Sequence, residues 1–289
     1  MNETNLVEII TQTINTLLSN LFSSVDNSLY SILDDITFLN SDIMHDSFFN
    51  QIFNSSGNNT ILVIANSLLL GFLLYYGVQY FLCSYTFLPV QRPYQFVFKL
   101  LLIVIFMNAS FFLCEKLLFF NNALSSSIRY LGEVWLKKEI CFSSLVTELN
   151  TAISANGDFN LFSIDGIIKS FISIGLLNLV FSYSLRYIMV KVFLLISPFA
   201  ILSLCLTSTS WFFKMWLRSF LSLLLLQVLI SCILLITFSI PFQANLFSQI
   251  LYIGCIYALT RANLFMRQIM GGISTDIQAN INVMRSFSH

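Results

Sequence analysis

The chain has 289 residues, of which 57% are hydrophobic and only 10% are charged, and its 14 basic and 14 acidic side chains leave no net charge. A soluble domain usually carries about 25% charged residues and could not cover this much apolar surface. The composition therefore excludes an ordinary soluble protein and predicts an all-α integral membrane protein.

Residues 1–60 are predicted to lie outside the cytoplasm. This region contains seven acidic residues and no Lys or Arg. Over residues 1–25 apolar side chains recur at steps of three and four, which is typical of an amphipathic helix. That helix can rest on a partner or a membrane surface, but its polar face prevents it from spanning.

Two membrane crossings are predicted within residues 61–120. The first runs from Ile61 to about Cys83, and the second runs from about Val97 to Phe120. Each apolar stretch provides the ~20 residues that a helical crossing needs. Residues 121–165 are less hydrophobic, so we expect them to form an extracytoplasmic loop domain between spans.

Residues 166–265 are predicted to form a three-helix membrane core with a break near 197–213. Pro198 removes a backbone donor, so a long helix over 166–196 is expected to end there. Residues 192–206 would then form a short re-entrant or interfacial segment. Further spans are expected at Lys214–Ile240 and Phe247–Leu264, followed by a short cytoplasmic tail over 266–289.

The distribution of charge favours about five spans. With one crossing in 166–206, the N-terminus is outside and the C-terminus is cytoplasmic. The inside then holds nine cations against one acid, whereas the outside holds five cations against thirteen acids. A second crossing there would leave four cations inside and ten outside, against the positive-inside rule.

The sequence contains no P-loop, no H-E-x-x-H and no G-x-S-x-G motif. His45 and His289 are the only histidines and are far apart, so no metal site is expected. The sequence thus predicts a protein that is not an enzyme and that binds no cofactor.

Polar side chains within apolar stretches are the candidate functional positions, because burying them is costly unless a partner satisfies them. Arg186 and Lys191 are expected to reach the inner headgroups, with docking of a cytoplasmic partner as the alternative. Gln227 is expected either to bond a neighbouring helix or to line a pore. The complete set of candidate positions is Arg186, Lys191, Pro198, Trp211, Lys214, Trp216, Arg218 and Gln227, with Trp211 and Trp216 as interfacial anchors around Lys214.

The stretch RYIMVKVFLLISPFAILSL at 186–204, followed by TSTSWFFKMWLRSFLSLLLLQVLIS at 207–231, resembles the TrbL-like membrane subunits of conjugative type IV secretion systems. The likeness covers about residues 165–275. It implies a multi-pass inner-membrane subunit in an oligomeric assembly, partnered by other membrane subunits and by cytoplasmic ATPases, with DNA or protein as cargo. Several relatives carry a large C-terminal domain, whereas the tail here is short.

Two functions are compatible with these features. The first is a non-enzymatic channel or scaffold subunit of a type IV secretion machine, embedded in the lipid bilayer. The alternative is a transporter or permease subunit for small molecules. Broken helices at matching positions of two repeats would favour the transporter, and the sequence shows one break, at 197–198, without a matching half.

The charge distribution gives a direct test of orientation. In a cysteine-free variant, single cysteines at Ser24 and Ser144 should react with a membrane-impermeant maleimide in intact cells. A cysteine at Ser286 should react only after permeabilisation, because the tail is placed on the cytoplasmic side. External labelling at Ser286 would rule out the five-span order.

Overall fold

A computed structural model of the chain describes residues 13, 27–47, 49, 60–86, 93–145, 147–148, 164–206, 208–240 and 246–270. These residues are almost entirely helical and include no strand, which confirms the all-helical prediction. Apart from Thr13, the predicted amphipathic helix over 1–25 lies outside the described residues. The part of the cytoplasmic tail after residue 270 also lies outside them.

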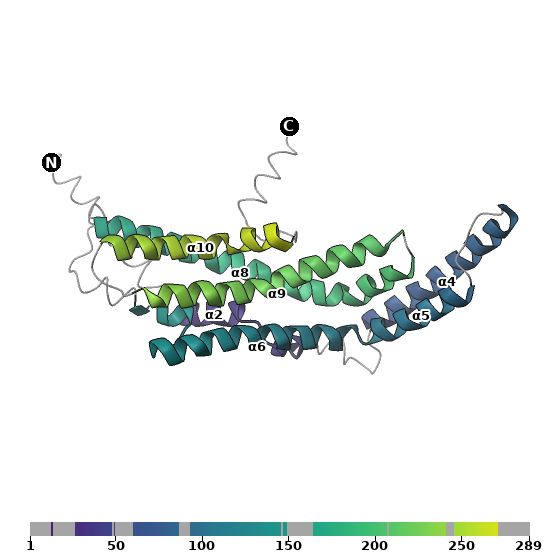
Figure 1. Ribbon diagram of the computed structural model, residues 1–289, viewed down its shortest axis with the longest axis horizontal. Helices are drawn as coiled ribbons and strands as arrows, with labels where there is room; N and C mark the ends of the chain where they lie inside the picture. Colours follow the sequence, from purple (N-terminus) through teal and green to yellow (C-terminus); the bar gives the residue numbers. More distant parts are fainter. Residues whose placement is uncertain are drawn as a thin grey trace, which may run out of the picture.

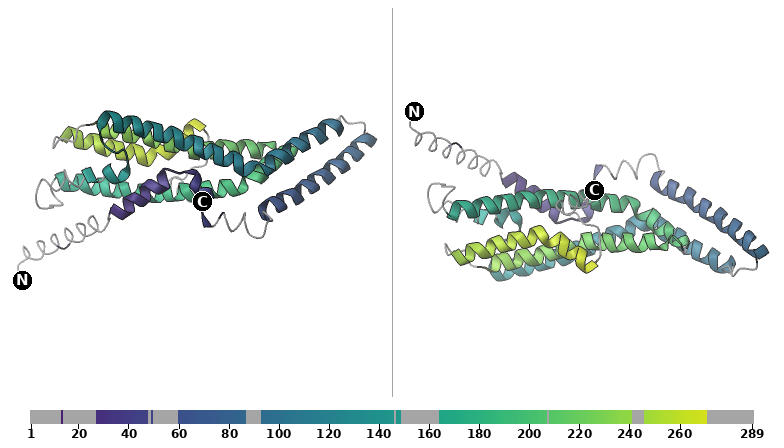
Figure 2. Two further views of the ribbon diagram at one scale, coloured as in Figure 1. Left: turned by 90° about the horizontal axis from the view of Figure 1, so that it is seen from below. Right: turned by 90° about the horizontal axis from the view of Figure 1, so that it is seen from above.

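Four long helices run alongside one another and form the main bundle (Figures 1 and 2). They are α6 (Ser110–Leu136), α8 (Ile164–Leu202), α9 (Ser210–Ser239) and α10 (Leu246–Met270). The helix α9 packs against both α6 and α10, and α8 packs against α9 and α10. The bundle therefore has α9 at its centre, which is consistent with the many buried residues of that helix.

Two glycines allow close approach between these helices. A Cβ atom on Gly132 of α6 would lie 2.6 Å from Leu235 Cδ1 of α9, and one on Gly175 of α8 would lie 2.6 Å from Ile256 Cγ2 of α10. Membrane helices gain little from the hydrophobic effect between them, so close packing of small residues contributes much of their association.

The helices α4 (Thr60–Thr86) and α5 (Pro93–Asn108) form an arm that leaves one end of the bundle (Figures 1 and 2). The ring of Tyr76 stacks on Phe96 with 3.5 Å between centroids, which joins the two helices. At the base of the arm, Lys99 Nζ donates a hydrogen bond to Cys205 O at 3.2 Å. Most other side chains of α4 are apolar and exposed, as expected for a helix surrounded by lipid.

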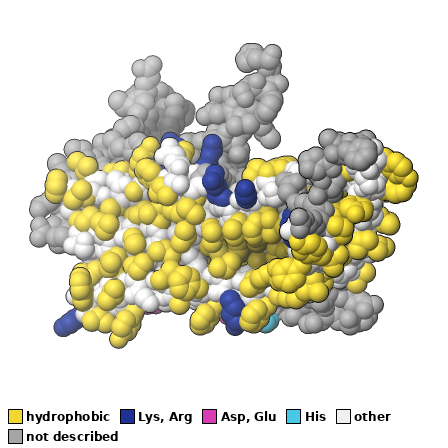
Figure 3. Space-filling view, turned by 45° about the vertical axis from the view of Figure 1, so that its right-hand side comes forward, with side chains coloured by type: hydrophobic (Ala, Val, Ile, Leu, Met, Phe, Trp, Pro, Cys, Tyr) yellow, Lys and Arg dark blue, Asp and Glu magenta, His cyan; other side chains and the backbone are white. Residues whose placement is uncertain are grey.

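Three helices are long and apolar enough to cross a membrane: Ile61–Tyr85, Ile174–Cys205 and Ser210–Ser239. A fourth span results if α5 and α6, which meet at an angle of 57°, are counted as one broken crossing. Apolar side chains cover most of the described surface in Figure 3. These features are those of a helical membrane protein. The helix α10 covers the predicted last crossing but is not among these spans, so the count of five remains a prediction.

The second crossing and the loop domain differ from the prediction. The predicted span Val97–Phe120 is interrupted at Asn108–Ala109, and α6 then continues to Leu136. Residues 121–136 therefore belong to the bundle rather than to a separate loop domain that starts at 121. The physical reason is a buried face on α6 that consists mainly of small and polar residues and comprises Ser110, Cys114, Leu118, Asn121, Ser125 and Gly132.

The chain breaks within the predicted interval 197–213, but not at Pro198, because α8 continues through the proline to Leu202. Proline has no N–H, so it leaves the carbonyl of Leu194 without its usual helical donor. The hydroxyl of Ser197 donates to that carbonyl at 2.7 Å. The helix ends instead in the short 3₁₀ helix η3 (Ser203–Cys205), which leads into α9. Residues 192–202 are therefore part of α8 and not a re-entrant segment.

One contact does not follow from the predicted order of spans. Ala65, near the predicted outer end of α4, is buried in the same apolar cluster as Ile201 and Leu202, near the predicted inner end of α8. The predicted order places these two helix ends on opposite sides of the membrane, so this contact does not support that order.

The Ser197–Pro198 pair gives a stability prediction. The Ser197→Ala variant should be destabilised by about 1–3 kcal/mol, because a buried carbonyl loses its donor. In a Pro198→Ala background the same change should cost much less, since the amide of residue 198 can now donate to Leu194 O. Thermal unfolding of the four proteins in detergent gives the coupling by a double-mutant cycle.

A matched control is Ser127→Ala in α6, where the hydroxyl donates to Ala123 O at 2.8 Å in an exposed setting. That carbonyl keeps its helical backbone donor, so the loss should be small. Equal destabilisation by Ser197→Ala with and without Pro198 would show that the hydroxyl does not compensate for the proline.

Candidate functional site

The N-terminal segment, defined as residues 27–47, lies between α6 and α8 (Figure 2). It contains α2 (Asn27–Thr37) and the 3₁₀ helix η1 (Ser41–Met44). Its apolar side chains, including Leu33, Leu39 and Ile43, are buried in clusters with residues of α6, α8 and α9. The segment is thus an integral part of the bundle, which the prediction of an extracytoplasmic region over 1–60 did not include.

Arg186 of α8 joins this segment to the bundle. Its side chain is fully buried. Nη1 donates to Thr37 O at 2.8 Å, and Nε donates to Leu223 O of α9 at 2.8 Å. Thr37 is the last residue of α2, so its carbonyl is one of the four that a helix leaves unpaired. The partial negative charge at that helix end favours a cation.

This position of Arg186 differs from the expectation that it reaches the headgroups. Within the described residues, no acidic side chain forms an ion pair with Arg186, and its Nη2 has no hydrogen-bond partner. The backbone carbonyls of Thr37 and Leu223 therefore stabilise the buried positive charge of Arg186. Arginine suits this role because its planar fork donates in several directions at once.

Lys191, one turn further along α8, also contacts the N-terminal segment rather than the headgroups. Its Nζ lies 2.6 Å from Asp46 Oδ2 and 4.7 Å from the centroid of the Tyr187 ring. The hydrogen bond and charge of Lys191 lower the pKa of the Asp46 carboxyl. The predicted topology places Asp46 outside the membrane and Lys191 on the cytoplasmic side. Their ion pair shows that the N-terminal segment reaches the position of Lys191 along α8.

Two further contacts hold the segment to the chain around the end of α6. The Asp34 carboxylate accepts hydrogen bonds from the backbone N–H groups of Phe142 and Ser143, at 2.7 and 3.1 Å. Burial raises the pKa of Asp34 despite these donors. The guanidinium of Arg129 lies 4.0 Å from the centroid of the Phe38 ring, a cation–π contact.

An amide network links α9, α6 and the segment. Asn121 Nδ2 donates to Gln227 Oε1 at 3.2 Å, and Gln227 Nε2 donates to Asn122 Oδ1 at 3.3 Å. Asn122 in turn donates to Asn40 Oδ1 at 3.3 Å. Gln227 is fully buried, so between the two alternatives left open by the sequence, the structure shows the bond to a neighbouring helix.

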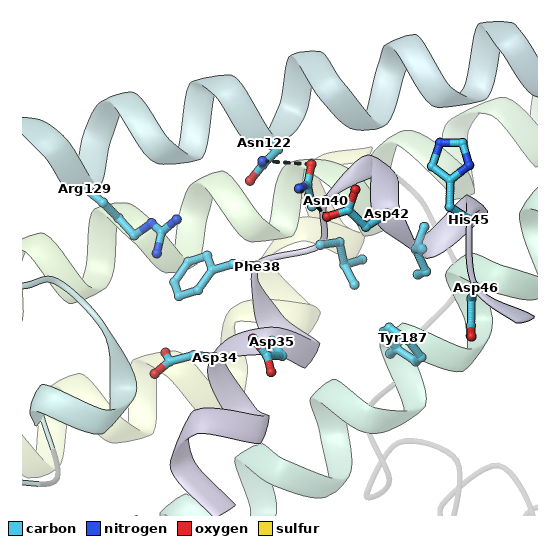
Figure 4. A pocket seen from close by; sticks show the side chains of 12 residues that line it. Asp34, Asp35, Phe38, Asn40, Asp42, His45, Asp46, Asn122, Arg129 and Tyr187 are labelled. Atoms are coloured by element: carbon cyan, nitrogen blue, oxygen red, sulfur yellow. Dashed lines mark hydrogen bonds between the residues drawn. The ribbon is translucent and has the colours of Figure 1, made fainter. Parts of the chain in front are cut away.

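A polar cavity of about 780 Å³ lies between the segment, α6 and α8 (Figure 4). Four carboxylates from the segment line it, together with Arg129, Asn122 and Tyr187; the carboxylates are those of Asp34, Asp35, Asp42 and Asp46. Figure 4 shows Asn122 and Asn40 joined across one side of it. In the part of the chain that the structure describes, no group of three or more His, Cys, Asp or Glu side chains is placed to hold a metal ion.

The other predicted positions separate into two groups. Trp216 is buried and its Nε1 donates to Phe193 O at 3.0 Å, so it locks α9 to α8 and is not an interfacial anchor. Trp211, Lys214 and Arg218 are exposed on α9. Pro198 lies inside α8, as described above.

Sequence reasoning missed the partners of Arg186 and Gln227. Asn121 and Asn122 were assigned to the extracytoplasmic loop domain, and Thr37 takes part through its backbone, which no side-chain pattern reveals. Residues 1–60 contain acidic side chains but no Lys or Arg. This imbalance could have predicted that an acid such as Asp46 pairs with a Lys or Arg of a membrane helix.

The contacts of Arg186 predict a local effect of its removal. Arg186→Met keeps an apolar chain of similar length but leaves Thr37 O without a donor, so docking of the segment should weaken. Hydrogen exchange measured by mass spectrometry should become about tenfold or more faster for residues 32–37, with little change in α9. Arg186→Lys should give a smaller loss, since an ammonium cannot span both carbonyls as the guanidinium does.

The matched control is Arg218→Met, an exposed arginine of α9, which should leave exchange unchanged throughout. Acceleration by Arg186→Met in every helix alike would contradict a local docking role.

Comparisons with known proteins return nothing: no protein-family model, no curated protein and no solved structure matches this chain.

Proposed function

We propose that this chain is a non-enzymatic channel or scaffold subunit of a type IV secretion machine in the cytoplasmic membrane, acting in the transfer of DNA or protein. The proposal is supported mainly by one observation: buried polar side chains form hydrogen bonds within the chain itself. Arg186, Gln227 and Asn121 bind other parts of the same chain, at distances of 2.8 to 3.2 Å. Such an interior holds segments in place, which is what a scaffold requires.

The resemblance of residues 186–231 to TrbL-like subunits supports the same proposal. We place the N-terminus outside, five spans in the membrane with α10 as the fifth, and the C-terminus in the cytoplasm. The energy for transfer comes from separate cytoplasmic ATPases in this proposal. The exposed cations Lys214 and Arg218 on the first turns of α9 offer these partners a basic surface on the proposed cytoplasmic side.

One observation favours the alternative, a transporter subunit for small molecules. The acidic cavity of about 780 Å³ is large enough for a small solute. The described chain also contains two helix breaks, at Asn108–Ala109 and at Ser203–Thr209, as transporters often do. However, the cavity is lined mainly by the N-terminal segment and lies away from both breaks, so the features of a transporter site do not coincide.

A gene deletion separates the two functions. We expect deletion to abolish conjugative transfer or secretion without altering growth, and complementation with the wild-type chain to restore it. Lys214→Glu should reduce copurification of cytoplasmic ATPases, because charge reversal at an interface replaces attraction with repulsion. Lys137→Glu, at an exposed lysine just past the C-terminal end of α6, is the control that should behave as wild type.

Normal transfer in the deletion strain, together with lost uptake or export of a small solute, would assign the chain to the transporter class. Arg186→Glu is unsuitable for testing partner docking, since a buried carboxylate in place of Arg186 would face two carbonyl oxygens.

A further inference from the structure

A second cavity, of about 520 Å³, lies where the two helix breaks meet. It is bounded by the α5–α6 junction, by the end of α8 and by the start of α9. Its lining is almost entirely aliphatic and aromatic, and includes Ile103, Phe106, Leu113, Ile201, Phe213 and Trp216. This lining excludes a polar solute and suits a hydrocarbon chain.

Two polar side chains line the cavity, and each indicates a chemical group that a ligand there should carry. Ser110 is fully buried, and its Oγ has no hydrogen-bond partner in the described chain. An unsatisfied buried hydroxyl costs about 1–3 kcal/mol, which an acceptor inside the cavity would recover. Lys116 is exposed at the edge, with its ammonium 5.1 Å from the centroid of the Phe112 ring.

We propose that this cavity binds one acyl chain of an anionic phospholipid. The chain fills the apolar lining, an ester carbonyl accepts a hydrogen bond from Ser110 Oγ, and the headgroup phosphate pairs with Lys116. Lys116 is the only charged group that lines the cavity among the described residues, and the neighbouring Glu115 does not line it. The charge at the mouth therefore complements an anion.

This site is independent of secretion or transport, because it needs only the bilayer as its source of ligand. It lies against the α5–α6 bend, so a bound lipid would pack into the angle between the arm and the bundle. The lipid would thereby add to the contacts between α5 and α6 at the bend.

Trp216 lines the cavity and is a built-in reporter. A variant carrying Trp135→Phe and Trp211→Phe retains it as the sole tryptophan. We would reconstitute this variant in bilayers with increasing fractions of phospholipid brominated on its acyl chains, with either a phosphatidylglycerol or a phosphatidylcholine headgroup. Quenching of Trp216 should reach half its maximum at a lower fraction of the anionic lipid. A variant that keeps only Trp211, whose exposed fraction is 58%, reports the surrounding lipid, and its quenching should not respond to Lys116→Gln.

The two polar groups have separable effects. Lys116→Gln should reduce the preference for the anionic lipid by about fivefold, the factor expected for one lysine near an anionic headgroup. Ser110→Ala should weaken quenching by both lipids equally, since both carry the ester carbonyl. Lys137→Gln, remote from the cavity, should change neither.

Three results would overturn the proposal. Equal quenching profiles for Trp216 and Trp211 would mean that the cavity takes up only ordinary surrounding lipid. A preference that survives Lys116→Gln would place the headgroup elsewhere. Stronger quenching by a brominated free fatty acid than by the phospholipid would assign the cavity to a different ligand. Because Lys116 is exposed, its substitution should not disturb folding, and circular dichroism in detergent verifies this.

Discussion

The guanidinium of Arg186 is held between the last carbonyl of α2 and a carbonyl in the middle of α9, and the arrangement around it depends on both bonds. An isolated charge in an apolar interior is strongly unfavourable. Hydrogen bonds to a charged donor contribute about 1.5–3 kcal/mol each, and the α2 dipole adds to them. The N-terminal segment therefore covers α8 and also provides a carbonyl oxygen that stabilises the buried charge of Arg186.

Around this contact the bundle satisfies its polar groups locally. The hydroxyl of Ser197 replaces the donor that Pro198 lacks, and Gln227 bonds two asparagines of α6. In lipid no water can substitute for a missing partner, so these compensating hydrogen bonds matter, although Arg186 Nη2 and Ser110 Oγ remain without a partner in the described chain. The glycines and serines on the contacting faces let the helices approach closely enough for these short bonds to form.

The long apolar helices could be predicted from sequence, because length and hydropathy are sufficient for them. The first and fourth predicted spans, Ile61–Cys83 and Lys214–Ile240, correspond to α4 and α9 within a few residues. The bend at Asn108–Ala109 could not be predicted from sequence, since neither residue is a proline or glycine. The end of α8 was placed too early because the compensation by Ser197 depends on a side-chain rotamer. Gln227 was identified, but its partners in α6 require tertiary contact, although the small and polar face of α6 was visible in its spacing.

The contact between Thr37 and Arg186 joins residues 149 positions apart, and this separation sets an order of events during synthesis. At ordinary translation rates Arg186 emerges on the order of ten seconds after Thr37, and Leu223 follows later still. The first part of the chain to be made is thus among the last to reach its final place. Until then, the carbonyl of Thr37 lacks the hydrogen bond from Arg186. Insertion of the first helices is therefore not sufficient to complete the contact between the N-terminal segment and α8.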